Sequence, residues 1–271
     1  MQWLGIEQIS VFCLPPVDYV TLAADLGCNG ISLALEGMGH NAGYPPYSLR
    51  DDPLLRRETR TALRDRGIAL SIGEGLLLRP GLDPRDLAAD MDMLAEMGCE
   101  RINSLSVDRR ADPSRLFDDF ALFAQMVADR GMTATVEIVP MLPIGSLAAA
   151  QALLAHVNRP DFRLVLDMMH LHRLRISPAA IAALDPAQIA HVQLCDIADT
   201  LPPEAYMDAA LHERLTPGDG DVPIDAYLAA LPKGLTYGLE VPQRARANAG
   251  IGPHDRLRPV VAAARHLLGD D

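Results

Sequence analysis

The chain alternates between two kinds of segment, and this alternation constrains its fold more than any other feature. Eight short apolar runs are predicted to be buried strands. They cover residues 5–12, 30–37, 69–75, 101–107, 133–139, 163–168, 190–195 and 235–241. Between them lie amphipathic stretches with helical spacing, such as 54–67, 85–98 and 115–131. Eight strand–helix units at this length predict an α/β protein, a single-domain (β/α)8 TIM barrel over residues 1–271.

Glycines and prolines at the segment boundaries support this division. Four glycines follow helical stretches two to four residues before a strand, where glycine ends a helix because it accepts positive φ. These are Gly27, Gly67, Gly98 and Gly131. Three helical stretches begin with a capping residue and a proline, at Asp83, Asp112 and Ser177. A doubly wound open sheet is the alternative, but no G-x-G-x-x-G motif follows the first strand.

Composition excludes several classes of function. The formal net charge is −12, from 24 basic and 36 acidic residues, which disfavours binding to nucleic acid. No apolar stretch approaches the roughly 18 residues of a membrane span, and the N-terminus lacks the features of a signal peptide. The four cysteines form no C-x-x-C pair, as expected for reduced thiols in a cytoplasmic protein.

Four oxygen-bearing side chains stand at the ends of four successive predicted strands: Glu137, Asp167, Gln193 and Glu240. Because the C-terminal ends of barrel strands meet around one site, these side chains are expected to converge. Three carboxylates and an amide suit one divalent metal ion, namely Mn, Mg, Co or Zn. Taken singly, each residue could instead cap a helix or pair with an arginine.

Alternation along the strands places the polar residues on one face. Side chains two residues apart share a face of a strand. Thr135 therefore accompanies Glu137, and His191 accompanies Gln193, while their apolar neighbours point the other way. Gly238 likewise shares the face of Glu240. We predict that this face lines the barrel.

The segments LVLDMMHLHR, HVQLCD, ERLTPGDGDVP and LEVP resemble the sugar phosphate isomerase/epimerase, or xylose isomerase-like TIM-barrel, superfamily. The resemblance is densest from residue 133 to 242. It implies that the four strand-end residues hold the metal, that His170 holds a substrate oxygen, and that Arg214 reaches the metal site or the substrate. Ketohexose 3-epimerases of this superfamily carry His at the position of Gln193. Members similar to hydroxypyruvate isomerases and 3-dehydroshikimate dehydratases carry Gln.

We therefore expect a metal-dependent isomerase or epimerase that acts on a small hydroxy-ketone or sugar-like substrate through an enediolate. Glu137 and Glu240 would be the catalytic residues that move the proton. A lyase resembling 3-dehydroshikimate dehydratase is the alternative, and a non-catalytic barrel that binds a sugar-like ligand is a second one. The expected context is sugar metabolism in the cytoplasm, with a small molecule as partner. Pairing of two copies as a homodimer is left open.

Substrate specificity in this fold resides on the loops after strands one to four. Here these are the segments around residues 14–16, 37–47, 76–79 and 107–110. His40 and Glu74 are candidate substrate contacts in this region. Arg244 and Arg246 follow the last strand, and either could bind an anionic substrate or a surface carboxylate.

Overall fold

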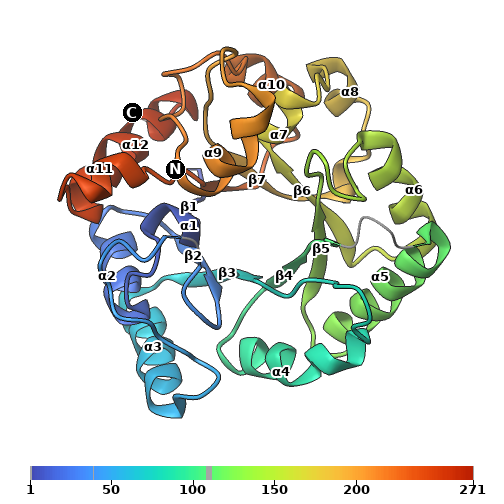
Figure 1. Ribbon diagram of the computed structural model, residues 1–271, viewed down its shortest axis with the longest axis horizontal. Coiled ribbons are helices and arrows are strands. Elements are labelled where there is room, and N and C mark those ends of the chain that lie inside the picture. Colours follow the sequence, from blue (N-terminus) through green and yellow to red (C-terminus); the bar gives the residue numbers. More distant parts are fainter. Residues whose placement is uncertain (1, 39, 108–111, 271) are drawn as a thin grey trace.

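Eight parallel strands form a closed barrel (Figure 1). Because β8 pairs with β1, the open-sheet alternative is excluded. The protein is represented by a computed structural model that describes residues 2–38, 40–107 and 112–270. The strands are β1 (Leu4–Ile6), β2 (Gly30–Ala34), β3 (Ala69–Glu74), β4 (Arg101–Ser104), β5 (Thr133–Glu137), β6 (Phe162–Asp167), β7 (Ile189–Leu194) and β8 (Thr236–Leu239). The predicted (β/α)8 barrel is confirmed.

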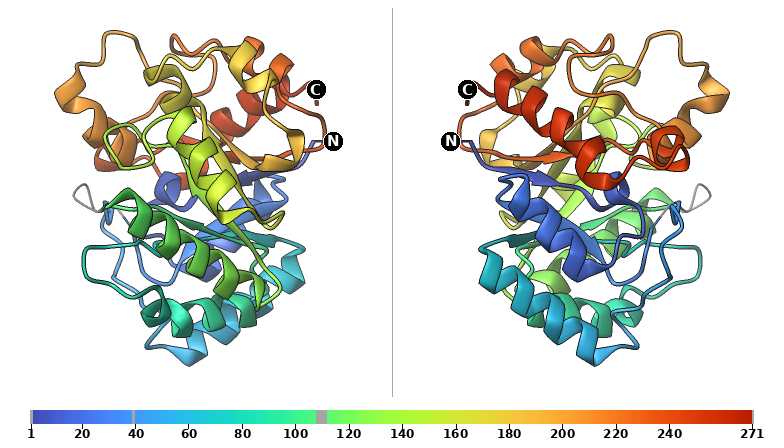
Figure 2. Two further views of the ribbon diagram at one scale, coloured as in Figure 1. Left: turned by 90° about the vertical axis from the view of Figure 1, so that its right-hand side faces the viewer. Right: turned by 90° about the vertical axis from the view of Figure 1, so that its left-hand side faces the viewer.

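Helices surround this barrel on its outer side (Figures 1 and 2). The α-helices are α1 (Gln8–Val11), α2 (Pro16–Asp25), α3 (Pro53–Arg66), α4 (Ala88–Glu96), α5 (Pro113–Ala128), α6 (Leu147–Val157), α7 (Met168–Arg173), α8 (Pro178–Ala182), α9 (Tyr206–His212), α10 (Ile224–Ala230), α11 (Arg244–Asn248) and α12 (Pro253–Leu267). Three 3-10 turns are η1 (Pro84–Leu87), η2 (Pro186–Gln188) and η3 (Pro203–Ala205). None of the helices in the described ranges is long and apolar enough to cross a membrane.

The predicted helix boundaries are present. Asp112 accepts a hydrogen bond from the Ser114 amide at 2.9 Å, and Asp83 and Ser177 cap their helices in the same way. The four boundary glycines all have positive φ, between 66° and 82°. Local sequence therefore sets where these helices begin and end, and with them the positions of the strand ends.

The prediction of the first strand is wrong for the second half of its range. Residues 5–12 do not form one strand, because β1 ends at Ile6 and α1 follows immediately. The Gln8 amide donates to Ser32 Oγ at 2.9 Å, and the Ser10 amide turns back to the Glu7 carbonyl at 3.0 Å. The whole segment is buried, so its apolar residues fit a short buried helix as well as a strand.

Polar side chains fill the barrel interior, as the alternation predicted. His191 is fully buried, with Nε2 2.8 Å from Glu7 Oε1 and Nδ1 2.8 Å from Thr236 Oγ1. A Cβ atom on Gly238 would lie 1.6 Å from Glu7 Oε1, so only glycine leaves room for this carboxylate. Glu7 from the β1 end and His191 from β7 thus meet inside the barrel.

Candidate metal centre

The strand-end residues predicted as metal ligands lie side by side at the C-terminal edge of the barrel. Glu137 and Asp167 are the last residues of β5 and β6, and Asp167 is the direct register partner of Gln193 on β7. Glu240 follows β8 directly. Oxygen atoms of Glu137 and Asp167 and a ring nitrogen of His170 all lie within 4.8 Å of one another, which makes them a possible ion-binding group.

Arg214 joins two of these carboxylates. Its Nη1 atom lies 2.5 Å from Asp167 Oδ2 and 2.9 Å from Glu240 Oε2. Its Nε atom donates to the Ala210 carbonyl at 2.8 Å, and Cys195 Sγ lies 3.3 Å from Nη1. The predicted approach of Arg214 to the site is thus present in the structure, and the guanidinium orients Asp167 and Glu240 toward each other.

The loop that carries Arg214 is held by one buried carboxylate. Asp196 accepts hydrogen bonds from the amides of Gly218, Gly220 and Val222, each at 3.0 Å. A Cβ atom on Gly220 would lie 2.4 Å from Asp196 Oδ1, which explains why glycine stands there. The P-G-D-G segment and Asp196 therefore fix the geometry of this loop.

Glu137 is held by two neighbours. Its Oε1 lies 3.1 Å from His170 Nε2, and its Oε2 accepts from Asn103 Nδ2 at 3.4 Å. The other ring nitrogen of His170 is 2.5 Å from the hydroxyl of Tyr206. His170 is therefore engaged on both sides, and its imidazole is a possible metal ligand in addition to the substrate contact that the sequence predicted.

The surroundings of Gln193 show whether the four strand-end residues fit a metal ion. Its side chain is only 1% exposed, and its Oε1 has no hydrogen-bond partner among the described residues. A buried carbonyl oxygen without a partner is unfavourable by about 1–3 kcal/mol, and a cation would remove that cost. Three carboxylates and Arg214 leave a formal charge of about −2, which one divalent ion would neutralise. The residues fit such an ion.

The pKa values of Glu240 and Asp167 are shifted in opposite directions. Burial, together with Asp167 and Glu137, raises the pKa of Glu240 well above its usual value, against the opposing charge of Arg214. Burial also acts to raise the pKa of Asp167, but Arg214 and His170 outweigh it and hold that pKa below its usual range. Without a metal ion, the site therefore keeps one carboxylate charged and favours a proton on the other.

Glu7 is a polar residue of the barrel interior that sequence reasoning missed. It is 2% exposed, and its Oε2 atom has no partner in the described part of the chain. The available signal was a single charged residue in the otherwise uncharged segment GIEQISVF, which the mistaken strand obscured. Burial and, after it, the charge of Glu7 raise the pKa of Glu74 at the end of β3.

The structure places Glu74 close to the site and His40 farther out. Burial, Glu7 and Glu137 raise the pKa of Glu74 well above its usual value, whereas a hydrogen bond with Asn103 lowers it. His40 lies on the loop after β2, where Nε2 is 2.9 Å from Asn248 Oδ1 and the ring packs edge-on against Phe12 at 5.3 Å. Both remain predicted substrate contacts.

The two arginines after β8 already have protein partners. Arg244 forms two hydrogen bonds with the exposed carboxylate of Asp208, at 3.0 and 2.6 Å. Arg246 donates to Gln243 at 3.4 Å. Of the two interpretations left open for Arg244, the surface carboxylate is the one present. Of the candidate specificity segment 107–110, only Val107 lies within the described residues.

A closed (β/α)8 barrel with a candidate metal centre at its strand ends defines the class of this protein. The chain belongs to the xylose isomerase-like TIM barrel family, whose model matches residues 20–264. This confirms the resemblance drawn from the sequence.

Known proteins similar to the chain include enzymes of different types. It is 22% identical over 243 residues to a 3-dehydroshikimate dehydratase from Pseudomonas putida, which covers 84% of the chain but 35% of that relative. The chain thus spans about a third of its curated relative. Its fold matches the IOLI protein with a bound zinc atom, with a TM-score of 0.80, 15% identity and coverage of 99% and 98% of the two chains.

A D-allulose 3-epimerase from Methylomonas sp., solved with D-allulose, also matches. Its TM-score is 0.71 at 15% identity, and coverage is 100% of this chain and 97% of that one. These structural matches show a shared fold. Two of these three relatives are named as enzymes and the third holds a zinc atom, so the type of reaction of this chain has to be argued from its own site.

Proposed function

We propose that the chain is a divalent-metal-dependent isomerase or epimerase of a small hydroxy-ketone or sugar-like substrate. The observation that carries this proposal is the grouping of Glu137, Asp167, Glu240 and the unpartnered oxygen of Gln193 at adjoining strand ends. A bound ion would supply a Lewis acid that polarises the substrate carbonyl and stabilises the charge that develops when the adjacent carbon loses a proton.

The protein side chains divide the remaining tasks. Glu137, oriented by His170 and Asn103, would take the proton from the carbon next to the carbonyl. Glu240, held by Arg214 and three strands away, would return it from another direction. Asp167 and Gln193 would hold the ion without moving protons.

The test is hydrogen exchange at the substrate carbon. Protein loaded with Mn is incubated with hydroxy-ketones, including D-allulose, in D2O, and deuterium incorporation and product are followed by NMR. We expect Glu137→Gln and Glu240→Gln to slow exchange about 100- to 10,000-fold while the metal stays bound. Glu213→Gln, a surface carboxylate on the loop beside Arg214, is the matched control. Unchanged exchange in both site variants, with metal present, would contradict the proposal.

A lyase of the 3-dehydroshikimate dehydratase type is the second candidate. Elimination of water needs an acid that protonates the leaving hydroxyl. Glu74, whose raised pKa favours the protonated form, is a third carboxyl group near Glu137 and could serve as that acid. The curated relative from Pseudomonas putida and the presence of Gln193 point in the same direction.

Ultraviolet absorbance distinguishes the two reactions. Dehydration of 3-dehydroshikimate gives an aromatic product with strong absorbance, whereas isomerisation of a ketose does not. Metal binding without exchange or dehydration of any substrate would favour a non-catalytic, ligand-binding barrel. The cytoplasmic location, the role in sugar metabolism and the homodimer remain predictions from the sequence.

A further inference from the structure

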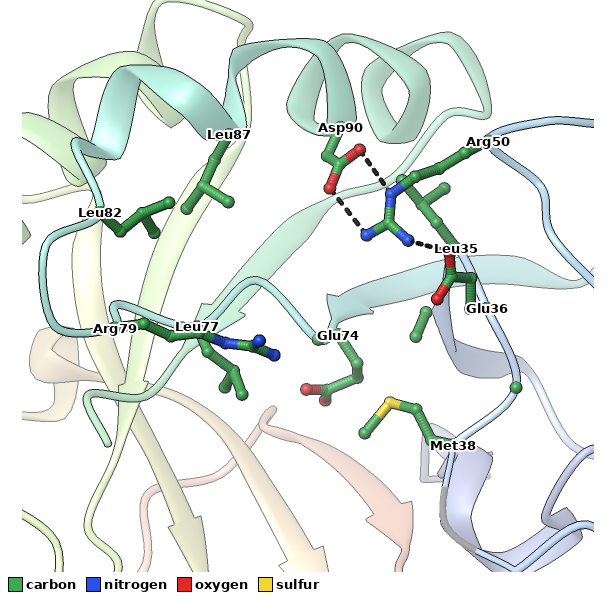
Figure 3. Close-up of a pocket in the computed structure, with 13 residues that line it drawn as sticks. Leu35, Glu36, Met38, Arg50, Glu74, Leu77, Arg79, Leu82, Leu87 and Asp90 are labelled. Atoms are coloured by element: carbon green, nitrogen blue, oxygen red, sulfur yellow. Dashed lines mark hydrogen bonds and ion pairs between the residues drawn. The ribbon is translucent and has the colours of Figure 1, made fainter. Parts of the chain in front are cut away.

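A cavity of about 490 Å³ lies beside the candidate metal centre, over the ends of β2 and β3 (Figure 3). Its volume falls within the range of small-molecule binding sites. Much of its wall is apolar, from the side chains of Leu35, Met38, Leu77, Leu82 and Leu87. The proposed isomerase mechanism uses no residue that lines this cavity, and the lyase alternative uses only Glu74.

Two arginines line the cavity, and their surroundings differ. Arg50 forms two hydrogen bonds with Asp90, both at 2.8 Å, and a 2.6 Å ion pair with Glu36. The guanidinium of Arg79 has no ion pair and no hydrogen bond with any residue in the ranges 2–38, 40–107 and 112–270, and only its backbone carbonyl accepts a hydrogen bond, from the Leu82 amide at 3.1 Å. The charge of Arg50 is therefore compensated within the protein, whereas the described residues supply no partner for the charge of Arg79.

Glu74 connects the cavity to the metal centre. In Figure 3 its carboxyl group and the guanidinium of Arg79 point into the same space. Glu74 interacts with Asn103, and Asn103 in turn donates to Glu137 at 3.4 Å. A ligand that contacts Glu74 would thus be connected through Asn103 to Glu137, the proposed base. Arg79 would contact the other side of the ligand.

We propose that Arg79 binds a carboxylate of the substrate, so that the substrate is a hydroxy-keto acid and not a neutral ketose. This inference rests on the proposed function for the part of the substrate that reacts. A guanidinium forms two parallel hydrogen bonds with a carboxylate. A phosphate dianion fits less well, because Arg79 is the one cation without a partner among the described residues of the cavity wall, and the carboxyl group of Glu74 points into the same space.

The test compares an acid with its neutral ester. Shikimate has no ketone and cannot react, and methyl shikimate has the same ring without the charge. Calorimetry on Mn-loaded protein should show that the acid binds at least about tenfold more tightly than the ester. Arg79→Met should weaken binding of the acid about 10- to 100-fold and leave the ester unchanged. Arg85→Met is the control, because Arg85 pairs with Asp83 outside this cavity.

Several results would overturn the proposal. These are equal affinities for acid and ester in the unaltered protein, an equal loss for both in Arg79→Met, and Arg79-dependent binding of inorganic phosphate that is tighter than that of shikimate. Because the probes do not react, the outcome is independent of turnover. Absence of hydrogen exchange would contradict the proposed function, whereas a preference for the acid that depends on Arg79 would still support the subsite.

Discussion

The two halves of the barrel use their strand ends differently. On β5 to β8 the polar side chains contact one another, and Arg214, His170 and Asn103 fix each carboxylate at short distances. Over β2 and β3 the space is instead an apolar-walled cavity with one arginine, Arg79, whose guanidinium has no partner in the described part of the chain. The first half provides a rigid, charged centre and the second provides room. This division separates the groups suited to chemistry from those suited to substrate choice.

The largest effect is expected when a carboxylate of the charged half is removed. Asp167→Asn should lower metal affinity at least about 100-fold and turnover about 1,000-fold. It also leaves Arg214 with Glu240 as its remaining carboxylate partner, which should destabilise the fold by about 3 kcal/mol. Asp199→Asn, which removes a surface carboxylate bound to His172, is the control. Full metal binding in Asp167→Asn would remove the distinction between the halves.

Gln193→Leu should lower metal affinity and raise the stability of the metal-free protein. Loss of the amide oxygen should weaken metal binding about 10- to 100-fold in a titration with Mn. The metal-free protein should become more stable by about 1 kcal/mol, because a buried unpartnered oxygen is gone. Gln193→His, which restores a ligand atom, should recover much of the affinity. If Gln193→Leu binds Mn as the unaltered protein does, the amide is not a ligand.

Gly238→Ala tests the interior contact between Glu7, after β1, and His191 on β7. The added Cβ would collide with Glu7 Oε1 at 1.6 Å and with His191 Nε2 at 2.6 Å. We expect a loss of about 1–3 kcal/mol in unfolding free energy and a fall of several degrees in Tm. Gly252→Ala, with nothing within 4 Å of its Cβ, should change little. Equal stability of both variants would show that Glu7 does not occupy the interior.

The smallest effect concerns Glu74 on the cavity side. Its pKa is raised above the ordinary value of 4.5, so the folded protein binds this proton more tightly than the unfolded chain. Stability conferred by that proton is therefore complete at low pH and is lost as pH rises from about 4.5 through the folded pKa. Glu74→Gln should be more stable than the unaltered protein by about 1 kcal/mol at pH 7, and equally stable at pH 4. A pH-independent difference in Tm would contradict this.

The charged half was predictable from the sequence because its residues belong to the strands or follow them directly. Once the period of two is recognised, it fixes the side on which Glu137 and Gln193 point, and the barrel brings their strand ends together. Sequence spacing did not show the contact between His170 and Glu137, because both lie on elements whose relative approach depends on packing.

The cavity half was less predictable. Arg79 lies on a loop, where no periodicity indicates the direction of a side chain, although the segment 76–79 was expected to influence specificity. Glu7 was hidden because both faces of its segment are buried, which hides the turn from β1 into α1. The sequence pattern therefore predicted the residues carried by regular strands. Among the residues positioned by turns and loops it missed Glu7 and the direction of Arg79, and Arg214 was expected only from the family resemblance.

The most direct test of the central claim is the site of metal binding. A crystal structure of the protein grown with Mn, with anomalous scattering to locate the ion, should show one ion bound by Glu137, Asp167, Gln193 and Glu240. The same ion should be absent from crystals of the Asp167→Asn variant. An ion bound elsewhere in the chain, or one held by Glu137, Asp167 and His170 without Gln193 and Glu240, would contradict the account.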